Sequence, residues 1–541
     1  MTSSHPAATA TQARCLRADL EDAGWGVDAV AGLLGPVADG ALRRELRAPA
    51  LRVVRRSLEG SRHHGTAPDP VAVLTALFML GEPVSAAELD AALPRTGAAG
   101  ACEMGLVEPA PDRVVGRAPA SPVEPAQGSA GRTRLLRAVV DLRPHEAVDA
   151  DGHVRWWVAS DVGELVSGRP LAPDHVLGIG GAGLTLAGLT PREPVGAALD
   201  LGTGCGIQAL YLLRHAEHVT ATDISARALA FTAFNAALAG TAPGRLELVQ
   251  GSFLEPVAGR AFDLVVSNPP FVITPPAVRR AGVPLMEYRD AGGPVLPTLV
   301  PALAPHLKPG GTAVMLGNWE HRTGQDWRAQ VSGWLPEGLD AWVVQREVQD
   351  PVEYAAMWLR DGGTAPERDP LGFEAALDAW VDDFERRGVE ALGLGYLLLH
   401  RSRRVRAPWR ELEEIDSSTA PGLGDHVAAV IAVREALATM DDEHVARLHP
   451  VVAPDVTEER HYRPGQDDPT VIIVRQGGGF RRALPAGTAM AALVGVSDGE
   501  LSVAQVAQAV AALTGADSDA LLEEMVGCVR GLLHAGVLTL R

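Results

Sequence analysis

The sequence predicts an α/β protein built around a parallel β-sheet. Between about residues 195 and 402, short runs of apolar β-forming residues alternate with helical stretches, which is the pattern of βαβ units. Two unusual loops follow predicted strands in this region, the glycine-rich DLGTGCG at 200–206 and the proline-rich SNPPF at 267–271. Because ligands of open parallel sheets bind outside the carboxyl ends of the strands, these loops indicate a binding site at one edge of the sheet.

The chain has 541 residues, which is enough for three or four domains. We expect a mostly helical N-terminal domain at 1–132, the α/β domain at 133–408 and an α+β C-terminal domain at 409–541. The order helix, helix, short strand pair after Pro70 resembles a winged helix, and 117–131 reads as a linker. The last domain combines a hairpin around Gly477–Gly479 with two helical stretches and a final strand, which is also winged-helix-like.

Composition and charge exclude several classes of protein. A net charge of −19 argues against a protein that coats nucleic acid indiscriminately. The four cysteines are scattered, so we expect neither a disulfide framework nor a metal site. The N-terminus lacks a signal-peptide pattern, and uncharged runs such as 291–307 are too short and too rich in proline to cross a bilayer. These features predict a cytoplasmic protein.

One predicted helix in the N-terminal domain is strongly basic. Between Arg43 and Arg62 there are seven arginines and two glutamates, while Leu51, Val54 and Leu58 form an apolar stripe. The arginines form either a solvated helix face or a docking patch for a partner, which would be RNA or an acidic protein surface.

The glycine-rich loop predicts a nucleoside cofactor. Gly202, Gly204 and Gly206 let the backbone turn sharply and approach a ligand closely. Asp223 ends the next strand, 21 residues after Gly202, where a carboxylate can accept both ribose hydroxyl protons. Dinucleotide sites usually read G-x-G-x-x-G, whereas Asp200 here precedes the turn and is expected to face the pocket, where it would repel a pyrophosphate. S-adenosylmethionine, with its sulfonium charge, fits this loop better than NAD.

The third strand of the α/β region brings further residues to the adenine of this cofactor. It is followed by Ser252, a weaker acceptor for the adenine amino group than an acid, and by Phe253, which can pack on the ring. The predicted cofactor-binding residues are Asp200, Gly202, Thr203, Gly204, Gly206, Asp223, Ile224, Ser252, Phe253 and Asn268.

The proline-rich loop predicts the reacting site. The Asn268 side chain and the Pro269 carbonyl can both accept hydrogen bonds, and neither Pro269 nor Pro270 supplies an N–H that would compete. Two such acceptors suit a planar NH₂ group, which is either an amide or an exocyclic amine of adenine or guanine. Phe271 can stack on that flat group. Asn268, Pro269, Pro270 and Phe271 are therefore the predicted catalytic residues.

At these residues the sequence resembles class I S-adenosylmethionine-dependent methyltransferases that carry an Asn-Pro-Pro-Tyr/Phe motif. SNPPFVITPP is most similar to the HemK-type glutamine methyltransferases, and ribosomal RNA guanine and adenine methyltransferases of the small-domain group share NPPF. The likeness covers 195–320 and implies a Rossmann-like seven-stranded core over about 135–405. Tyr288–Gly293 occupies the place of a glycine-containing loop near the site, while 176–185 replaces the Pro-Arg-Pro segment of HemK proteins.

These features favour an N-methyltransferase that acts on a macromolecule through a planar NH₂ nitrogen. Protein glutamine is preferred slightly over an RNA base, which would be adenine N6 or guanine N2 of ribosomal or transfer RNA. A small molecule or peptide of secondary metabolism is a further alternative. A regulator that senses S-adenosylmethionine and binds nucleic acid is an alternative of another class, which the intact 268–271 motif disfavours.

Overall fold

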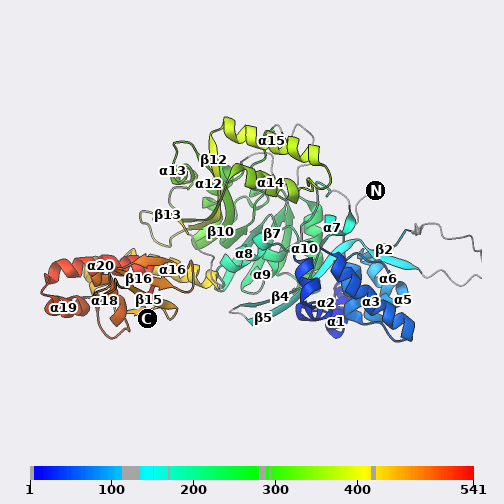
Figure 1. Ribbon diagram of the computed structural model, residues 1–541, viewed down its shortest axis with the longest axis horizontal. Helices are drawn as coiled ribbons and strands as arrows, with labels where there is room; N and C mark the ends of the chain where they lie inside the picture. The colour runs from blue at the N-terminus through cyan, green and yellow to red at the C-terminus, as the bar shows by residue number, and fades with distance from the viewer. Residues whose placement is uncertain are drawn as a thin grey trace, which may run out of the picture.

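The protein is described by a computed structural model with a helical N-terminal part, a central α/β part and a C-terminal part (Figure 1). It describes residues 5–111, 134–149, 152–168, 171–276, 278, 288–290, 294–415 and 422–540. The predicted linker at 117–131 lies outside the described residues.

The central sheet confirms the predicted α/β class. Its strands are β6 (Val195–Leu201), β7 (Ala216–Asp223), β8 (Leu246–Gln250), β9 (Phe262–Ser267), β10 (Leu307–Arg322), β11 (Asp340–Gln349), β12 (Val389–His400) and β13 (Arg410–Glu414). They lie in the order β13-β11-β12-β10-β9-β6-β7-β8. All neighbours are parallel except β12, which runs antiparallel to β10 and β11. The order β8-β7-β6-β9-β10 is that of a Rossmann-like sheet.

The sheet has eight strands, one more than the predicted seven. The additional strand β13 pairs in parallel with β11, from Ala341 opposite Arg410 to Gln345 opposite Glu414. The predicted domain boundary at 408/409, where the charge changes from basic to acidic, assigns this segment to the C-terminal domain, and RELEE itself contains no apolar run. Glu413 accepts a hydrogen bond of 2.6 Å from Trp342 Nε1, so polar side-chain contacts take the place of apolar ones at this edge.

Helices cover both faces of the sheet (Figure 1). They are α8 (Gly181–Leu189), α9 (Ile207–Leu212), α10 (Ala226–Ala239), α12 (Leu296–Ala302), α13 (Trp327–Ser332), α14 (Pro351–Asp361) and α15 (Pro370–Arg386), with 3₁₀ turns at Glu255–Val257 and Ala304–His306. Alternate strand residues point to two separate apolar layers: Leu199 and Val265 lie in one, Ala198 and Leu264 in the other.

The N-terminal part is mostly helical and contains a small sheet. After α1 (Ala10–Asp22), α2 (Val27–Leu42) and α3 (Ala48–His64) come α4 (Pro70–Leu74), a π-helical turn (Thr75–Met79), β1 (Val84–Ser85), α5 (Ala86–Ala92), α6 (Gly97–Glu103), β2 (Val107–Pro109) and β3 (Leu135–Ala138). The strands pair in the order β1-β3-β2. The strand β3 thus completes this small sheet, although it lies beyond the predicted boundary at 132, because its partners Val84 and Val107 are distant in the sequence.

A long hairpin connects this part to the core. Its strands β4 (Val140–Asp149) and β5 (Gly152–Asp161) pair antiparallel, with Asp149 opposite Gly152. A short helix, α7 (Glu164–Ser167), follows the hairpin.

The C-terminal part contains the predicted hairpin around Gly477–Gly479 and the predicted helical stretches with a final strand. Its elements are α16 (Leu423–Leu437), α17 (Asp442–Ala446), β14 (Pro450–Val452), β15 (Val456–His461), β16 (Val471–Gln476), β17 (Ala483–Pro485), α18 (Thr488–Val496), α19 (Val503–Thr514), α20 (Ser518–His534) and β18 (Leu538–Leu540). β16 and β17 form the hairpin around Gly477–Gly479, and β14 pairs with β18. Among the described residues, every helix is too short or too polar to cross a membrane.

Candidate active site

The glycine-rich loop turns sharply between β6 and α9. Gly202, Gly204 and Gly206 have φ angles of 78°, 57° and 85°, which are left-handed values that favour glycine. A Cβ added at Gly202 or Gly204 would meet no atom of the described residues within 4 Å, whereas one at Gly206 would lie 2.9 Å from Thr232 Cγ2. The first two glycines therefore border open space that suits a ligand, and the third allows close packing against α10.

The structure brings Asp223 to this loop, as the sequence spacing predicts. Asp223 Oδ2 accepts a hydrogen bond of 3.0 Å from Gly204 N, and Oδ1 accepts one of 2.9 Å from Ser225 N. Burial raises the pKa of Asp223, although backbone hydrogen bonds oppose that shift. Each carboxylate oxygen has a second lone pair, so both can still accept a ribose hydroxyl. Ile224, which comes next, is 58% exposed beside the loop, where an apolar ring could cover it.

Asp200 differs from its expected orientation. Instead of facing open space, it is buried, and its Oδ2 accepts hydrogen bonds of 2.6 Å from Thr203 Oγ1 and 2.9 Å from Ala209 N. Burial raises the pKa of Asp200 to about 7. The carboxylate and Thr203 thus fix the loop to the first turn of α9, and any part that they play in cofactor binding is indirect.

The ends of β7 and β8 place the predicted adenine contacts next to Asp223. Gly251 N donates a hydrogen bond of 3.0 Å to the Asp223 carbonyl, immediately before Ser252 and Phe253. Phe253 has a φ of 45°, a left-handed value that is strained for a bulky residue. Strained residues of this kind cluster at ligand sites, which supports the prediction for Phe253.

The proline-rich loop starts beside the glycine-rich loop. Leu201 and Ser267, the last residues of β6 and β9, are register partners, so Gly202 and Asn268 leave adjacent strand ends. The Asn268 side chain is partly exposed and has no hydrogen-bond partner in the part of the chain that the structure describes. The Pro269 carbonyl accepts a tight-turn hydrogen bond of 2.8 Å from Phe271 N and keeps one lone pair.

Aromatic side chains of α14 pack against the proline-rich loop. The Phe271 ring lies edge-on to Trp358, with 6.3 Å between ring centroids. The Tyr354 hydroxyl accepts a hydrogen bond of 3.2 Å from Ile273 N, and burial raises the pKa of Tyr354. These contacts hold 271–273 against the helical hairpin of α14 and α15, which is inserted between β11 and β12.

The segment 288–290 also returns to the proline-rich loop. Phe271 and Asp290 form an isolated antiparallel bridge, and Val272 N donates a hydrogen bond of 2.9 Å to the Arg289 carbonyl. The Tyr288 hydroxyl donates to Asp361 at the end of α14. The first half of the predicted Tyr288–Gly293 loop therefore lies near the candidate site, and 291–293 lie outside the described residues.

The arginine-rich segment Arg43–Arg62 lies in the N-terminal part and is partly neutralised. Arg43, Arg55 and Arg62 pair with Asp39, Glu82 and Glu88 at distances of 2.9, 2.8 and 2.7 Å. Leu51, Val54 and Leu58 are buried as expected. Arg44, Arg52 and Arg56 are exposed and make no ion pair with any described residue.

Sequence reasoning missed the residues that support the site from other elements. Ser267, Tyr354 and Trp358 contribute through contacts with residues 66 to 87 positions away. The only local signal was the aromatic spacing EYAAMW, which is equally typical of an ordinary buried helix face.

Two regions of the chain match known family models. Residues 180–282, which include both loops, match the family model described as methyltransferase small domain. Residues 22–117 match a domain of unknown function, DUF7059. The central region thus contains a methyltransferase small domain. The family matched by the N-terminal region has no known function, so that match indicates no activity.

Curated relatives match a part of the chain. The release factor glutamine methyltransferase of Cereibacter sphaeroides is 49% identical over 82 residues, which are 15% of this chain and 29% of the relative. The protein of the same name from Moorella thermoacetica is 36% identical over 150 residues, which are 26% and 52%. The chain thus spans about a third to a half of the length of these relatives.

Solved structures with some likeness include several methyltransferases. A ribosomal protein L11 methylase from Lactobacillus delbrueckii subsp. bulgaricus is 27% identical, with 25% of this chain and 57% of that chain covered and a TM-score of 0.18. An S-adenosylmethionine-dependent methyltransferase from Thiobacillus denitrificans, in complex with S-adenosyl-L-homocysteine, is 18% identical, with 43% and 94% covered and a TM-score of 0.25. These TM-scores are low, and the fold is assigned from the strand order of the central sheet and from the family match.

Proposed function

We propose that this protein is an S-adenosylmethionine-dependent N-methyltransferase that methylates the side-chain amide of a glutamine in a protein substrate. The observation that carries the proposal is the position of Asn268: it follows a strand end adjacent to that of the glycine-rich loop, and its side-chain amide has no hydrogen-bond partner among the described residues. The match of 180–282 to a methyltransferase small domain and the likeness to release factor glutamine methyltransferases support it. A cytoplasmic location goes with such a substrate.

The glycine-rich loop and its neighbours fit the cofactor. Open space at Gly202 and Gly204 would take its amino acid part, the two oxygens of Asp223 would accept its ribose hydroxyls, and Ile224 with Phe253 would cover its adenine. When bound, S-adenosylmethionine supplies a methyl group activated by a sulfonium.

The proline-rich loop would hold the substrate amide. The Asn268 side-chain oxygen and the Pro269 carbonyl accept its two N–H protons, which raises electron density on the nitrogen and aims it at the methyl carbon. Phe271, fixed by Trp358, packs on the planar group. The amide nitrogen would bond to the methyl carbon as the carbon–sulfur bond breaks with its electron pair left on sulfur, and the nitrogen would lose one proton to solvent, so no strong base is required.

An RNA base presents a similar NH₂ group and is the alternative substrate. Arg44, Arg52 and Arg56 are the observation that favours it, because exposed arginines without an acidic partner bind phosphates. The helix α6, which holds the place of a recognition helix in the winged-helix-like part, has the sequence GAAGACE and no basic residue, which supports protein over RNA.

The test is to incubate the full-length protein with methyl-labelled S-adenosylmethionine and separated cell protein and RNA. We expect label in protein, on a glutamine identified by mass spectrometry, and its loss with Asn268→Ala. Label that enters RNA alone would support the alternative, and label in neither fraction would contradict transfer to a macromolecule.

A further inference from the structure

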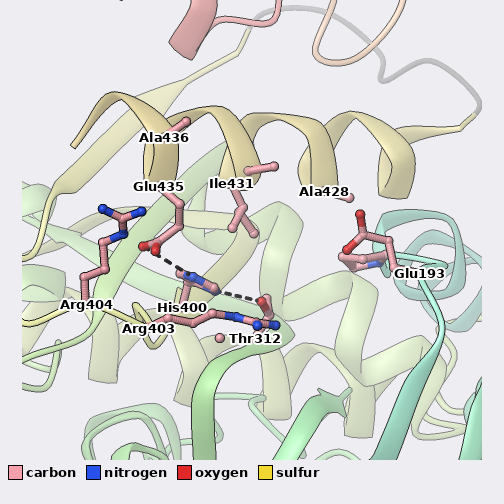
Figure 2. Close-up of a pocket in the computed structure, with 12 residues that line it drawn as sticks. Glu193, Thr312, His400, Arg403, Arg404, Ala428, Ile431, Glu435 and Ala436 are labelled. Atoms are coloured by element: carbon pink, nitrogen blue, oxygen red, sulfur yellow. Dashed lines mark hydrogen bonds and ion pairs between the residues drawn. The ribbon is translucent and has the colours of Figure 1, made fainter. Parts of the chain in front are cut away.

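The charges around the cavity at the amino edge of the sheet cancel. This cavity, of about 430 Å³, lies between the sheet and α16, with the His400 ring between Thr312 and Glu435 (Figure 2). Three arginines are balanced there by three acids, which are Arg403, Arg404, Arg406, Asp340, Glu193 and Glu435. The cavity therefore favours no charged ligand. The groups that bear on methyl transfer lie at the opposite edge of the sheet, around the proline-rich loop.

One face of α14 contacts the candidate site with three side chains. Tyr354, Trp358 and Asp361 are spaced i, i+4 and i+7, which places them on the same side of the helix. Tyr354 and Trp358 contact the proline-rich loop itself. Asp361 instead contacts the segment 288–290, which pairs with that loop. The helix therefore holds the loop both directly and through a second segment.

The Asp361 carboxylate fixes the segment 288–290 to α14. Its Oδ2 accepts a hydrogen bond of 2.8 Å from the Tyr288 hydroxyl and one of 3.2 Å from Arg289 Nη1. Burial raises the pKa of Tyr288, and the charge of Asp361 raises it further, so the hydroxyl keeps the proton that it donates. Arg289 Nη1 also donates to the Trp358 carbonyl oxygen. Tyr288, Arg289 and Asp361 together are called the carboxylate clamp below.

Two features of the end of α14 are explained by this clamp and not by the helix. Asp361 is the last residue of α14, where the helix macrodipole favours a positive side chain over a carboxylate. The next residue, Gly362, has a φ of −80° and a ψ of 6°, a conformation that residues other than glycine also adopt. A Cβ added there would collide with Arg289 Nη2, so the glycine leaves room for the guanidinium.

The clamp is connected to the ring that would pack on the substrate amide. The Arg289 side chain is 9% exposed, and a buried guanidinium is stabilised by an acidic partner. The Arg289 carbonyl oxygen accepts a hydrogen bond of 2.9 Å from Val272 N, and the adjacent Asp290 forms the bridge with Phe271. A displacement of 288–290 would therefore remove support from Phe271.

We infer that Asp361 is a positioning residue for methyl transfer. Through Tyr288 and Arg289 it holds 288–290 against the proline-rich loop, and so keeps Phe271 in place over the acceptor amide. This inference rests on the proposed function, because the acceptor amide is the group that Phe271 would hold. The contact between the clamp and the loop can be measured without the reaction.

The test combines two measurements on the full-length protein. Hydrogen exchange of 271–273, followed by mass spectrometry, reports on the Val272 N–H, and Asp361→Ala should speed its exchange about tenfold. With the substrate found in the labelled fractions, kcat should fall about tenfold, since a small misplacement of the acceptor is costly. The KM for S-adenosylmethionine should stay within about twofold, because the cofactor loop leaves other strands.

Two further variants separate positioning from general loss of stability. Asp361→Asn keeps an acceptor oxygen for Tyr288 and Arg289 and should recover most of kcat. Gly362→Ala should displace the Arg289 guanidinium and reproduce the loss of kcat, although the backbone conformation suits alanine.

Matched controls lie on other helices. Asp382→Ala removes an exposed acid of α15 that makes no ion pair with a described residue, and Gly527→Ala adds a methyl group at an open position of α20. Both should leave exchange and kcat unchanged. Unchanged exchange at Val272 in Asp361→Ala would overturn the inference, as would a kcat equal to that of Asp382→Ala. Absence of transfer by the unchanged protein would instead contradict the proposed function.

Discussion

The Ser267 hydroxyl donates a hydrogen bond of 2.8 Å to the Leu201 carbonyl oxygen, and so ties together the two strand ends from which the candidate site is built. Ser267 is fully buried and directly precedes Asn268, while Leu201 directly precedes Gly202. The Ser267 side chain therefore adds to the backbone pairing of β6 and β9 in fixing the relative position of the substrate loop and the cofactor loop.

Ser267→Ala should loosen this connection. Loss of the hydrogen bond should lower the free energy of unfolding by about 1 kcal/mol, because the serine hydroxyl is buried and paired. The methyl-transfer rate should fall more than stability suggests, since a small displacement of the nitrogen from the methyl carbon is costly. Urea unfolding and initial rates measure the two effects. Ser332→Ala, at a position in α13 without a side-chain hydrogen bond to a described residue, is the control, and equal rates in both variants would contradict this role for Ser267.

Gly202→Ala should weaken cofactor binding. The new methyl group would enter the open space beside the loop, and the left-handed φ of 78° should also cost about 1–2 kcal/mol in stability. Gly259→Ala is a matched control, because Gly259 has a φ of 76° and equally open surroundings in a turn before β9. Titration with S-adenosylhomocysteine should show weaker binding for Gly202→Ala only. A similar affinity in both variants would mean that the cofactor lies elsewhere.

Asp200 should make stability depend on pH. Its carboxyl has a pKa of about 7 when folded and about 4 when unfolded, so between these values the folded protein binds more protons than the unfolded chain. The free energy of unfolding should therefore decrease as pH rises from 4 to 7, relative to Asp200→Asn, which does not titrate. Urea unfolding of both proteins at several pH values measures this difference. Parallel curves would show that the folded pKa is not raised.

Reversal of charge at Arg44, Arg52 and Arg56 should distinguish the two macromolecular substrates. Changing all three to glutamate should leave methylation of a protein substrate within about twofold and with little dependence on salt, because these arginines lie on the N-terminal part away from both loops. An RNA substrate would instead bind much more weakly, and in the unchanged protein its binding would fall steeply with salt. Methylation rates at two salt concentrations decide between these results.

Much of the core could be predicted because its signals are local. The alternation of strands and helices predicted the sheet, and the interval from Gly202 to Asp223 predicted a contact that the structure shows at Gly204. The orientation of Asp200 was not predictable, since a carboxylate before a glycine turn can face either a ligand or the first turn of the next helix. The polar edge strand β13 depends on its pairing with β11, which is distant in the sequence, so no local pattern reveals it.

The most direct test of the account is the methyl-transfer rate of Asn268→Ala on the substrate found in the labelled fractions, together with its thermal unfolding. Removal of one aligned acceptor should reduce kcat roughly 10²–10³-fold while the unfolding temperature remains that of the unchanged protein. A rate within twofold of the unchanged protein would show that the nitrogen is not held by the Asn268 side chain.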